Sequence, residues 1–385
     1  MSAVLTLTRD QVVAHRVAVQ GLVSRAAALP EVAVLDLGVQ DTPPGALRAA
    51  VSARLAEPLA PDADLTAGGA LTLAWSHRGA PHLHRTAALP ALAAAGWPRD
   101  DADAAARLGW QRARLAAVGG AARPAFRAVA DAVRAVLDRP LTKGELSAAV
   151  TARIPPELAP FCRPCGTHHV SEQLLRLAAL PAGARLRAGA RPLLVEPIPD
   201  WAGPPADTAA GSAELQALYL RFFGAGSDAD VAAFLGTSRA AVAPDRPPGL
   251  VPARVDGRTA AVPEELVDAV RSAVPAEVVR LLPPSDPLVQ GRDRALLVPD
   301  PAHRKLLWPT LGPPGIVLSR TEVAAAWRAT QRGRVLEVAV QELRTLGAAE
   351  RAQLEQEAQR LAHVRGARET RVTIGSPGAA GSGPG

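Results

Sequence analysis

The stretch LTKGELSAAVTARIPP, residues 141–156, decides the fold, because it contains both the start and the stop of one helix. Thr142 and Glu145 have the spacing of a capping box, in which each side chain bonds the backbone N–H of the other residue. Leu146, Val150 and Ile154 follow at intervals of four and share one helical face. Two prolines then end the run. The stretch therefore predicts a short helix with one buried apolar face.

The residues after this helix extend it into a larger pattern. SEQLLRL (171–177) has helical spacing, and AGARLRAGARPLLVEP (182–197) has a glycine-centred turn between two strand-like runs. Arg185, Arg187 and Arg191 lie on or near that turn. Helix, turn, helix and basic hairpin is the order of a winged helix, in which the second helix enters a DNA groove and the hairpin touches the backbone.

The same order recurs further along the chain. The segment SDAD (227–230) precedes a second expected helix, VAAFLG, and GTS (236–238) makes a turn before another helix that starts at Arg239. Asp256-Gly257 is a two-residue hairpin signal. Two basic hairpins after two helix pairs predict two helix-turn-helix modules.

The two ends of the chain have different patterns. Residues 8–11 (TRDQ) predict a capped helix running towards Ala28, residues 46–55 predict a helix, and residues 70–75 predict a strand that leads into RGAPHLHR (78–85). From Leu296, the segments LLVP, GIVLS, EVAAAWRAT and RVLEVAV read as strands of a small sheet or barrel. Residues 346–364 return to a polar helix.

We therefore predict an α+β fold of tandem winged-helix modules with a small C-terminal β-barrel or sheet. The expected divisions are a first module over 1–125, a second over 126–200, a third over 201–280, a β-rich domain over 281–374 and a flexible tail over 375–385. At 385 residues the chain is too long for one hydrophobic core.

Composition and charge narrow the class of protein. The formal net charge is +6, and Lys143 and Lys305 are the only lysines, so arginine supplies almost all of the positive charge. Arginine suits phosphates and guanine edges, although a GC-rich genome produces the same bias. Neither a membrane span nor a signal peptide is expected. Two neighbouring cysteines do not make a disulfide framework. We expect a cytoplasmic, nucleoid-associated protein.

The segment CRPCGTHH contains Cys162, Cys165, His168 and His169, which are zinc-ligand types. Structural zinc sites usually draw ligand pairs from two separated segments, and four ligands within eight residues would have to wrap the ion tightly. We favour the alternative without a metal, in which the cysteines pack as small apolar residues. Arg163 and the histidines would then open the recognition helix towards phosphate.

Two further segments carry polar groups at the ends of apolar runs. In RGAPHLHR, an extended backbone would place His82 and His84 on one face, so that they and Arg78 either form a solvated strand end or contact phosphate or a lesion. In LDLGVQDTPPGAL (35–47), Gln40 and Asp41 stand between a buried apolar run and a proline-broken loop. This pair either ties the loop together or faces a ligand.

The segments GVQDTPP, RGAPHLHR, LTKGELSAAV, FCRPCGTHHV and GRDRALLVPDPAHRKLLWPTLGPPGIVL together resemble the actinobacterial branch of the AlkZ/YcaQ-type winged-helix DNA glycosylases. The resemblance extends to about Ile374. It implies three winged-helix modules and a β-barrel that form a concave shell around double-stranded DNA. It also implies excision of N7-alkylated purines, including unhooking of interstrand crosslinks, without a metal or organic cofactor.

The family's catalytic motif is Gln-apolar-Gln or Gln-apolar-Asp on a loop of the first module. With Gln40 in the first position the last position is Thr42, and with Gln40 in the last position the first is Gly38, so neither register reproduces the motif. A Gln-Asp pair still has suitable chemistry, since a carboxylate stabilises positive charge on the sugar and an amide can hold water. We expect Asp41 to act as base and electrostatic stabiliser, and Gln40 to position water.

The expected function is that of a monofunctional DNA glycosylase, with DNA contacts at the residues listed here: Arg78, His82, His84, Arg163, His169, Arg239 and, in the terminal domain, Arg328. The alternative is a DNA-binding regulator or structure-specific binder without catalysis, because winged helices often serve as binding modules. A third possibility is a protein-protein adaptor.

Overall fold

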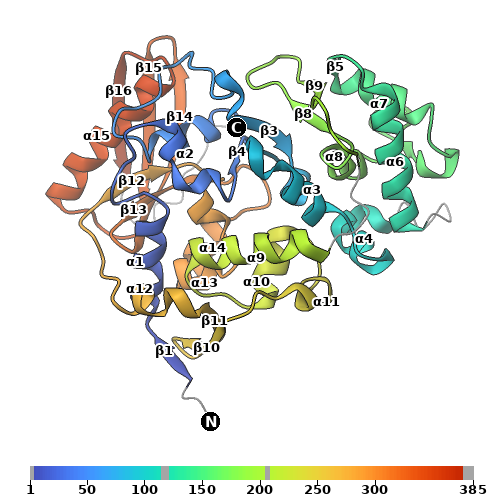
Figure 1. Ribbon diagram of the computed structural model, residues 1–385. Helices are drawn as coiled ribbons and strands as arrows, with labels where there is room; N and C mark the ends of the chain where they lie inside the picture. Colours follow the sequence, from blue (N-terminus) through green and yellow to red (C-terminus); the bar gives the residue numbers. More distant parts are fainter. Residues whose placement is uncertain (1–3, 114–120, 204–208, 376–385) are drawn as a thin grey trace.

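The computed structural model describes residues 4–113, 121–203 and 209–375 (Figure 1). It has mixed α and β structure with four small sheets in the described chain. The fold class predicted from the sequence is confirmed. The tail expected over 375–385 lies outside the described residues except for Gly375.

The second module has the order of two helices and a hairpin that residues 141–197 predicted. Its elements are α6 (Ala122–Val136), β5 (Leu141–Thr142), α7 (Lys143–Thr151), β6 (Phe161–Cys162), β7 (Thr167–His168), α8 (Glu172–Ala179), β8 (Ala184–Leu186) and β9 (Leu194–Pro197). The capping box of Thr142 and Glu145 is formed, and Leu146, Val150 and Ile154 are buried. β8 and β9 pair as the antiparallel wing.

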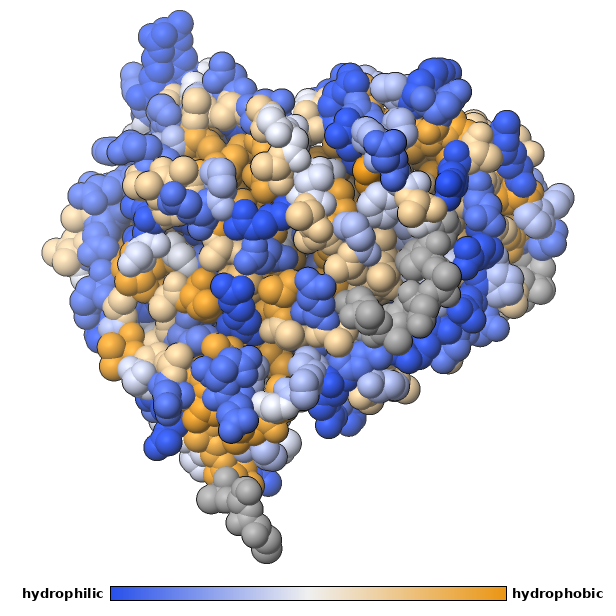
Figure 2. Space-filling model, in the orientation of Figure 1, coloured by the Kyte–Doolittle hydropathy of each residue, from blue (hydrophilic) through white to orange (hydrophobic). Residues whose placement is uncertain are grey.

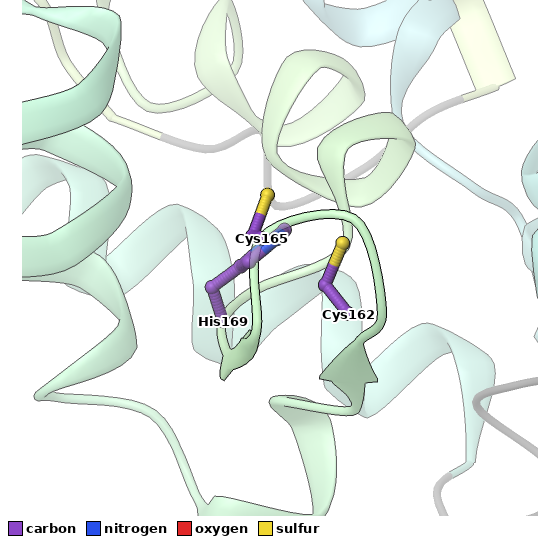
Figure 3. Close-up of side chains that lie close together, drawn as sticks. All are labelled: Cys162, Cys165 and His169. Atoms are coloured by element: carbon purple, nitrogen blue, oxygen red, sulfur yellow. The ribbon is translucent and has the colours of Figure 1, made fainter.

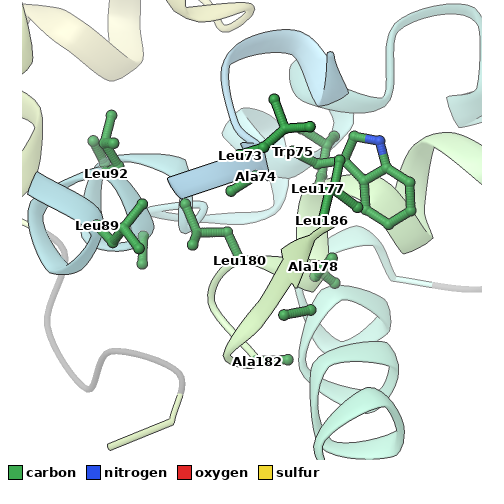
Figure 4. Packing of buried hydrophobic residues seen from close by; sticks show 14 of the residues in the cluster. Leu73, Ala74, Trp75, Leu89, Leu92, Leu177, Ala178, Leu180, Ala182 and Leu186 are labelled. Atoms are coloured by element: carbon green, nitrogen blue, oxygen red, sulfur yellow. The ribbon is translucent and has the colours of Figure 1, made fainter. Parts of the chain in front are cut away.

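The first module contributes strands to the same sheet. Its elements are β2 (Val39–Gln40), α2 (Ala46–Ser52), β3 (Leu71–Trp75), β4 (Pro81–Arg85), α3 (Leu89–Gly96) and α4 (Asp101–Leu108). The sheet runs in the order β2-β4-β3-β8-β9-β5, and Leu73 of β3 pairs with Leu186 of β8. Figure 4 shows Leu73, Leu180 and Leu186 packed in the core that the two modules share. The boundary at residue 125 therefore does not divide two cores.

The third module is completed by the N-terminus. It contains α9 (Ala209–Phe223), α10 (Asp228–Leu235), α11 (Arg239–Val242), β10 (Leu250–Val255), β11 (Arg258–Pro263) and α12 (Val267–Arg271). The Asp256-Gly257 turn joins β10 to β11 as predicted. β1 (Leu5–Leu7) pairs in parallel with β10, and α1 (Arg9–Val19) packs on α9 and α12. The first residues thus belong structurally with this module, although the sequence placed them in the first.

The C-terminal part is an open sheet. Its strands, in the order β12 to β16, are Val279–Leu282, Gly315–Ser319, Glu322–Arg332, Val335–Glu342 and Glu369–Gly375, and α15 (Ala348–Val364) packs against β12 and β16. The barrel alternative is wrong for the described chain, since β12 and β16 are edge strands. LLVP was predicted as a strand, but its two leucines lie in the helix α13 (Arg294–Leu297), and its last two residues lead towards α14 (Pro301–Leu307).

Two buried ion pairs fasten the segment before α13 to the N-terminal region. Arg54 donates to both carboxylate oxygens of Asp286 at 2.7 and 2.9 Å, and Arg16 donates to Asp293 at 3.0 Å. All four side chains are at most 2% exposed, so each charge depends on its partner.

None of the described helices is both long and apolar enough to cross a membrane.

Candidate functional site

The Gln40-Asp41 loop is held at the edge of the six-stranded sheet. Gln40 pairs with His82 across β2 and β4, and the Asp41 N–H donates to the Pro81 carbonyl at 2.8 Å. Val32, Val34, Leu35, Leu37 and Val39 are all buried, as the apolar pattern predicted. The buried run therefore delivers a polar pair to a fixed position at the end of a short strand.

Asp41 lines a cavity of about 610 Å³ between the first module and the wing of the second. The wall carries the carboxylates of Asp41, Asp62 and Asp64 and the guanidinium groups of Arg48, Arg187 and Arg191. Burial raises the pKa of Asp41, while the charges of Arg191 and Arg48 act in the opposite direction. Figure 2 shows the surface hollowed between the two lobes at the top of the view. The site combines a partly desolvated carboxylate with cations on facing elements.

The cations differ in how they are held. Arg48 donates to the carbonyls of Ala60 and Ala63, and Arg187 pairs with Glu196. Arg191 makes neither an ion pair nor a hydrogen bond within the described chain. Its charge at the rim is therefore available to an anionic ligand such as a phosphate.

Gln40 is the last residue of β2, and its side chain has different surroundings from that of Asp41, which follows the strand. Its Oε1 accepts from Gln290 Nε2 at 3.2 Å, and its Nε2 donates to the Thr42 carbonyl at 3.3 Å. Gln290 also accepts from Arg78 Nη2 at 2.9 Å. The two residues predicted to act together are adjacent in the chain, but only Asp41 lines the cavity.

Arg78 joins three parts of the molecule. Its guanidinium donates to the Phe234 carbonyl in α10 and to Gln290, and its own carbonyl accepts from Gln173 in α8 at 3.2 Å. Burial lowers its pKa to about 9. Its predicted contact with DNA stays a prediction, and its donors here are bound to protein groups.

The histidines of RGAPHLHR are buried beneath the Gln40-Asp41 loop. His82 and His84 share one face of β4, as expected, and Ser76 Oγ bonds His82 Nδ1 at 3.0 Å and His84 Nε2 at 2.9 Å. Burial lowers the pKa of both imidazoles, that of His84 to about 3, so that they are neutral at pH 7. Neutral rings that are at most 3% exposed support the loop, and their predicted phosphate contact is not accessible in this conformation.

The remaining predicted DNA contacts lie on separate surfaces. Arg163 is exposed at the tip of the β6–β7 hairpin, Arg239 is exposed at the start of α11, and Arg328 is exposed on β14, where it donates to the Gly312 carbonyl. His169 lies before α8, and its Nδ1 donates to the Val170 carbonyl at 2.7 Å. That bond raises the pKa of the imidazole. The structure therefore does not gather these residues into one site.

Three residues near the candidate site were missed from the sequence. Gln290 reaches Gln40 from 250 positions away, and Arg191 and Arg48 surround Asp41 from the wing and from α2. Gln290 could have been noticed, because it directly precedes the family-like GRDR motif at 291–294. Arg191 was noted as part of a basic hairpin, but nothing local related it to Asp41.

Cys162, Cys165 and His169 form a second cluster, away from the cavity. Their ligand-type atoms lie within 4.8 Å of one another, and no other such group of three occurs among the described residues. His168, which the sequence grouped with them, instead bonds the Ala159 carbonyl through Nδ1 at 2.9 Å.

Comparison with known proteins supplies the family. Residues 34–364 match the family described as DNA glycosylase AlkZ-like. Among solved structures, the chain is similar to Streptomyces sahachiroi DNA glycosylase AlkZ, with 21% sequence identity, a TM-score of 0.75, and coverage of 96% of this chain and 100% of that chain. None of the curated proteins compared with the chain matches it.

Proposed function

Since the chain belongs to the AlkZ-like DNA glycosylase family, we propose that it hydrolyses the N-glycosidic bond of an alkylated purine in double-stranded DNA at the cavity lined by Asp41. The observation that carries this proposal is the position of Asp41. It is a carboxylate whose pKa is raised by burial, in the wall of a cavity flanked by arginines from two modules. Perturbed carboxylates in cavities are typical of functional sites.

The reaction suits a single carboxylate. As the bond between C1′ and the purine breaks, its electrons pass to the base and positive charge develops on the sugar, where the Asp41 carboxylate stabilises it. The same group accepts a proton from the water that attacks C1′. A base that is already cationic through alkylation becomes neutral on leaving, so it needs little acid assistance.

A monofunctional mechanism agrees with the side chains of the cavity. A glycosylase that also cleaves the backbone needs an amine nucleophile to form a Schiff base. Neither Lys143 nor Lys305, the only lysines of the chain, lines the cavity. Water is therefore the expected nucleophile.

In this proposal, arginine side chains bind the phosphates of the DNA. Arg191, on the wing, holds a phosphate beside the cavity, while Arg163 and Arg239, exposed on the second and third modules, make separate phosphate contacts. Gln40 acts as a positioning residue, because its amide ties the loop to Gln290. It thereby fixes the approach of Asp41 to the sugar.

The decisive experiment is single-turnover release of N7-alkylguanine from a defined duplex, with all proteins saturated with DNA. Asp41→Asn should lower the rate by about 10²-fold or more, since it removes both the base and the charge. Asp62→Asn is the matched control, because it makes the same charge change in the wall of the same cavity. It should release the base near the wild-type rate. Equal rates for wild type and Asp41→Asn would refute the assigned role.

Two further arms separate the alternatives. A duplex joined by an N7-linked interstrand crosslink tests whether the cavity accepts the bulkier substrate, with unhooking visible as strand separation on a denaturing gel. If the wild type releases no base but binds DNA with a steep dependence on salt, the chain is a binding protein without catalysis, because phosphate contacts release counterions.

A further inference from the structure

The β6–β7 hairpin is a tight turn that brings two cysteines close together. Phe161 pairs with His168 and Cys162 with Thr167, so the chain reverses within a few residues. The Cys165 N–H and the Gly166 N–H both donate to the Cys162 carbonyl, at 3.2 and 2.9 Å. Gly166 has a φ of +65°, which suits glycine at a tight turn. This folding brings the second cysteine back towards the first.

The three side chains converge on one side of the hairpin. Figure 3 shows the sulfurs of Cys162 and Cys165 and the ring of His169 gathered there, with their ligand-type atoms within 4.8 Å of one another. Ligands of a tetrahedral zinc ion lie about 3.3–3.8 Å apart, given bond lengths of about 2.3 Å to sulfur and 2.0 Å to nitrogen. Small side-chain rotations would therefore complete the arrangement.

The imidazole of His169 is oriented as a ligand. Its Nδ1 donates to the Val170 carbonyl, which leaves the lone pair on Nε2. Nε2 is buried, no oxygen or nitrogen group of the described chain bonds it, and the side chain that interacts with the ring is the thiol of Cys162. A metal-bound histidine characteristically donates its other ring nitrogen in this way. His168 differs, since it is exposed and lies outside the cluster.

We propose that Cys162, Cys165 and His169 bind a zinc ion, with a water molecule as the fourth ligand. Thiolate and imidazole ligands in a tetrahedral arrangement favour zinc over harder cations. Cys165 is exposed, which leaves room for the water. The objection that four ligands within eight residues are too crowded does not apply, because the site uses three of them.

The site would act on the helix that follows it. Val170, directly after His169, is buried, and Ser171 caps α8. A zinc ion would therefore fix the hairpin and its exposed Arg163 at the start of the helix expected to enter the DNA groove. This assignment is independent of the reaction proposed for the cavity.

The test uses the full chain, reduced and freed of metal, titrated with Co²⁺ as a spectroscopic probe. One equivalent should bind and give thiolate-to-cobalt charge-transfer bands with tetrahedral d–d bands, and Zn²⁺ should abolish both. Cys165→Ser should bind Co²⁺ more weakly and lose about half of the charge-transfer intensity per bound ion, because one of the two thiolates is gone. His169→Gln should weaken binding by at least about tenfold.

His168→Gln is the matched control, since it removes the neighbouring imidazole from outside the cluster. It should bind Co²⁺ as the wild type does. Wild-type binding no tighter than that of Cys165→Ser would overturn the proposal. So would a Cys162–Cys165 disulfide that forms in air while Zn²⁺ is present, since this would identify a redox pair instead.

Discussion

Gly38→Ala tests whether the buried histidines hold the Asp41 loop in place. Gly38 has a φ of +96°, and a Cβ added there would lie 2.7 and 2.8 Å from the two nitrogens of His84, closer still to its Cε1. His84 is fully buried and bonded to Ser76, so the ring cannot swing away freely. The backbone conformation costs about 1–2 kcal/mol for an L side chain and the overlap about 1–3 kcal/mol. We expect a loss of about 2–5 kcal/mol in the free energy of unfolding.

The assay is denaturant unfolding of four proteins: wild type, Gly38→Ala, His84→Ala and the double variant. His84→Ala removes the ring that the new methyl group meets, so the double variant should be more stable than the sum of the single effects predicts by at least about 1 kcal/mol. A change below about 0.5 kcal/mol for Gly38→Ala, or additive effects in the cycle, would refute the reasoning.

Two other predictions concern charge. The excision rate should fall on the acid side as Asp41 becomes protonated, with a midpoint above the ordinary carboxyl pKa because burial raises it. Arg191→Gln should move that midpoint to higher pH, since it removes a cation that favours the carboxylate; an unchanged pH–rate profile would contradict this. Asp286→Ala should cost about 3–5 kcal/mol in denaturant unfolding, because it leaves Arg54 charged and unpaired in the interior. The double variant Asp286→Leu/Arg54→Met should lose less stability than Asp286→Ala, because it leaves no charge unpaired. An equal or greater loss would show that an unpaired Arg54 charge does not cause the destabilisation.

The helix-turn-helix modules could be predicted because their signals are local. The capping box at Thr142 and the Asp256-Gly257 turn each fix backbone geometry within a few residues. LLVP could not be assigned in this way, since a short apolar run fits either a strand or a buried helix. Asp293 precedes that run, but its buried bond to Arg16 depends on a residue far away in the sequence.

The sequence predicted the polar pair of the candidate site but not the residues that surround it. Asp41 stood out because a carboxylate at the rim of an apolar run is unusual. Its surroundings depend on contacts between distant segments, such as the bond from Gln290 to Gln40. His82 and Arg78 suggested a basic surface, but burial decides whether such groups are charged and reachable. Burial depends on how the modules pack, which no local pattern encodes.

The pairing of β3 with β8 has a mechanical consequence. β3 leads into β4, which pairs with the strand before Asp41, and β8 starts the wing. β3 and β8 are hydrogen-bonded neighbours in one sheet, and they lie over one core. Because the two strands also pack over one core, we expect the two halves of the sheet to move as one unit. The distance between the wing and the Asp41 loop would therefore be fixed. Wherever the wing binds the DNA backbone, the nucleotide that reaches Asp41 would lie at a set distance along the duplex.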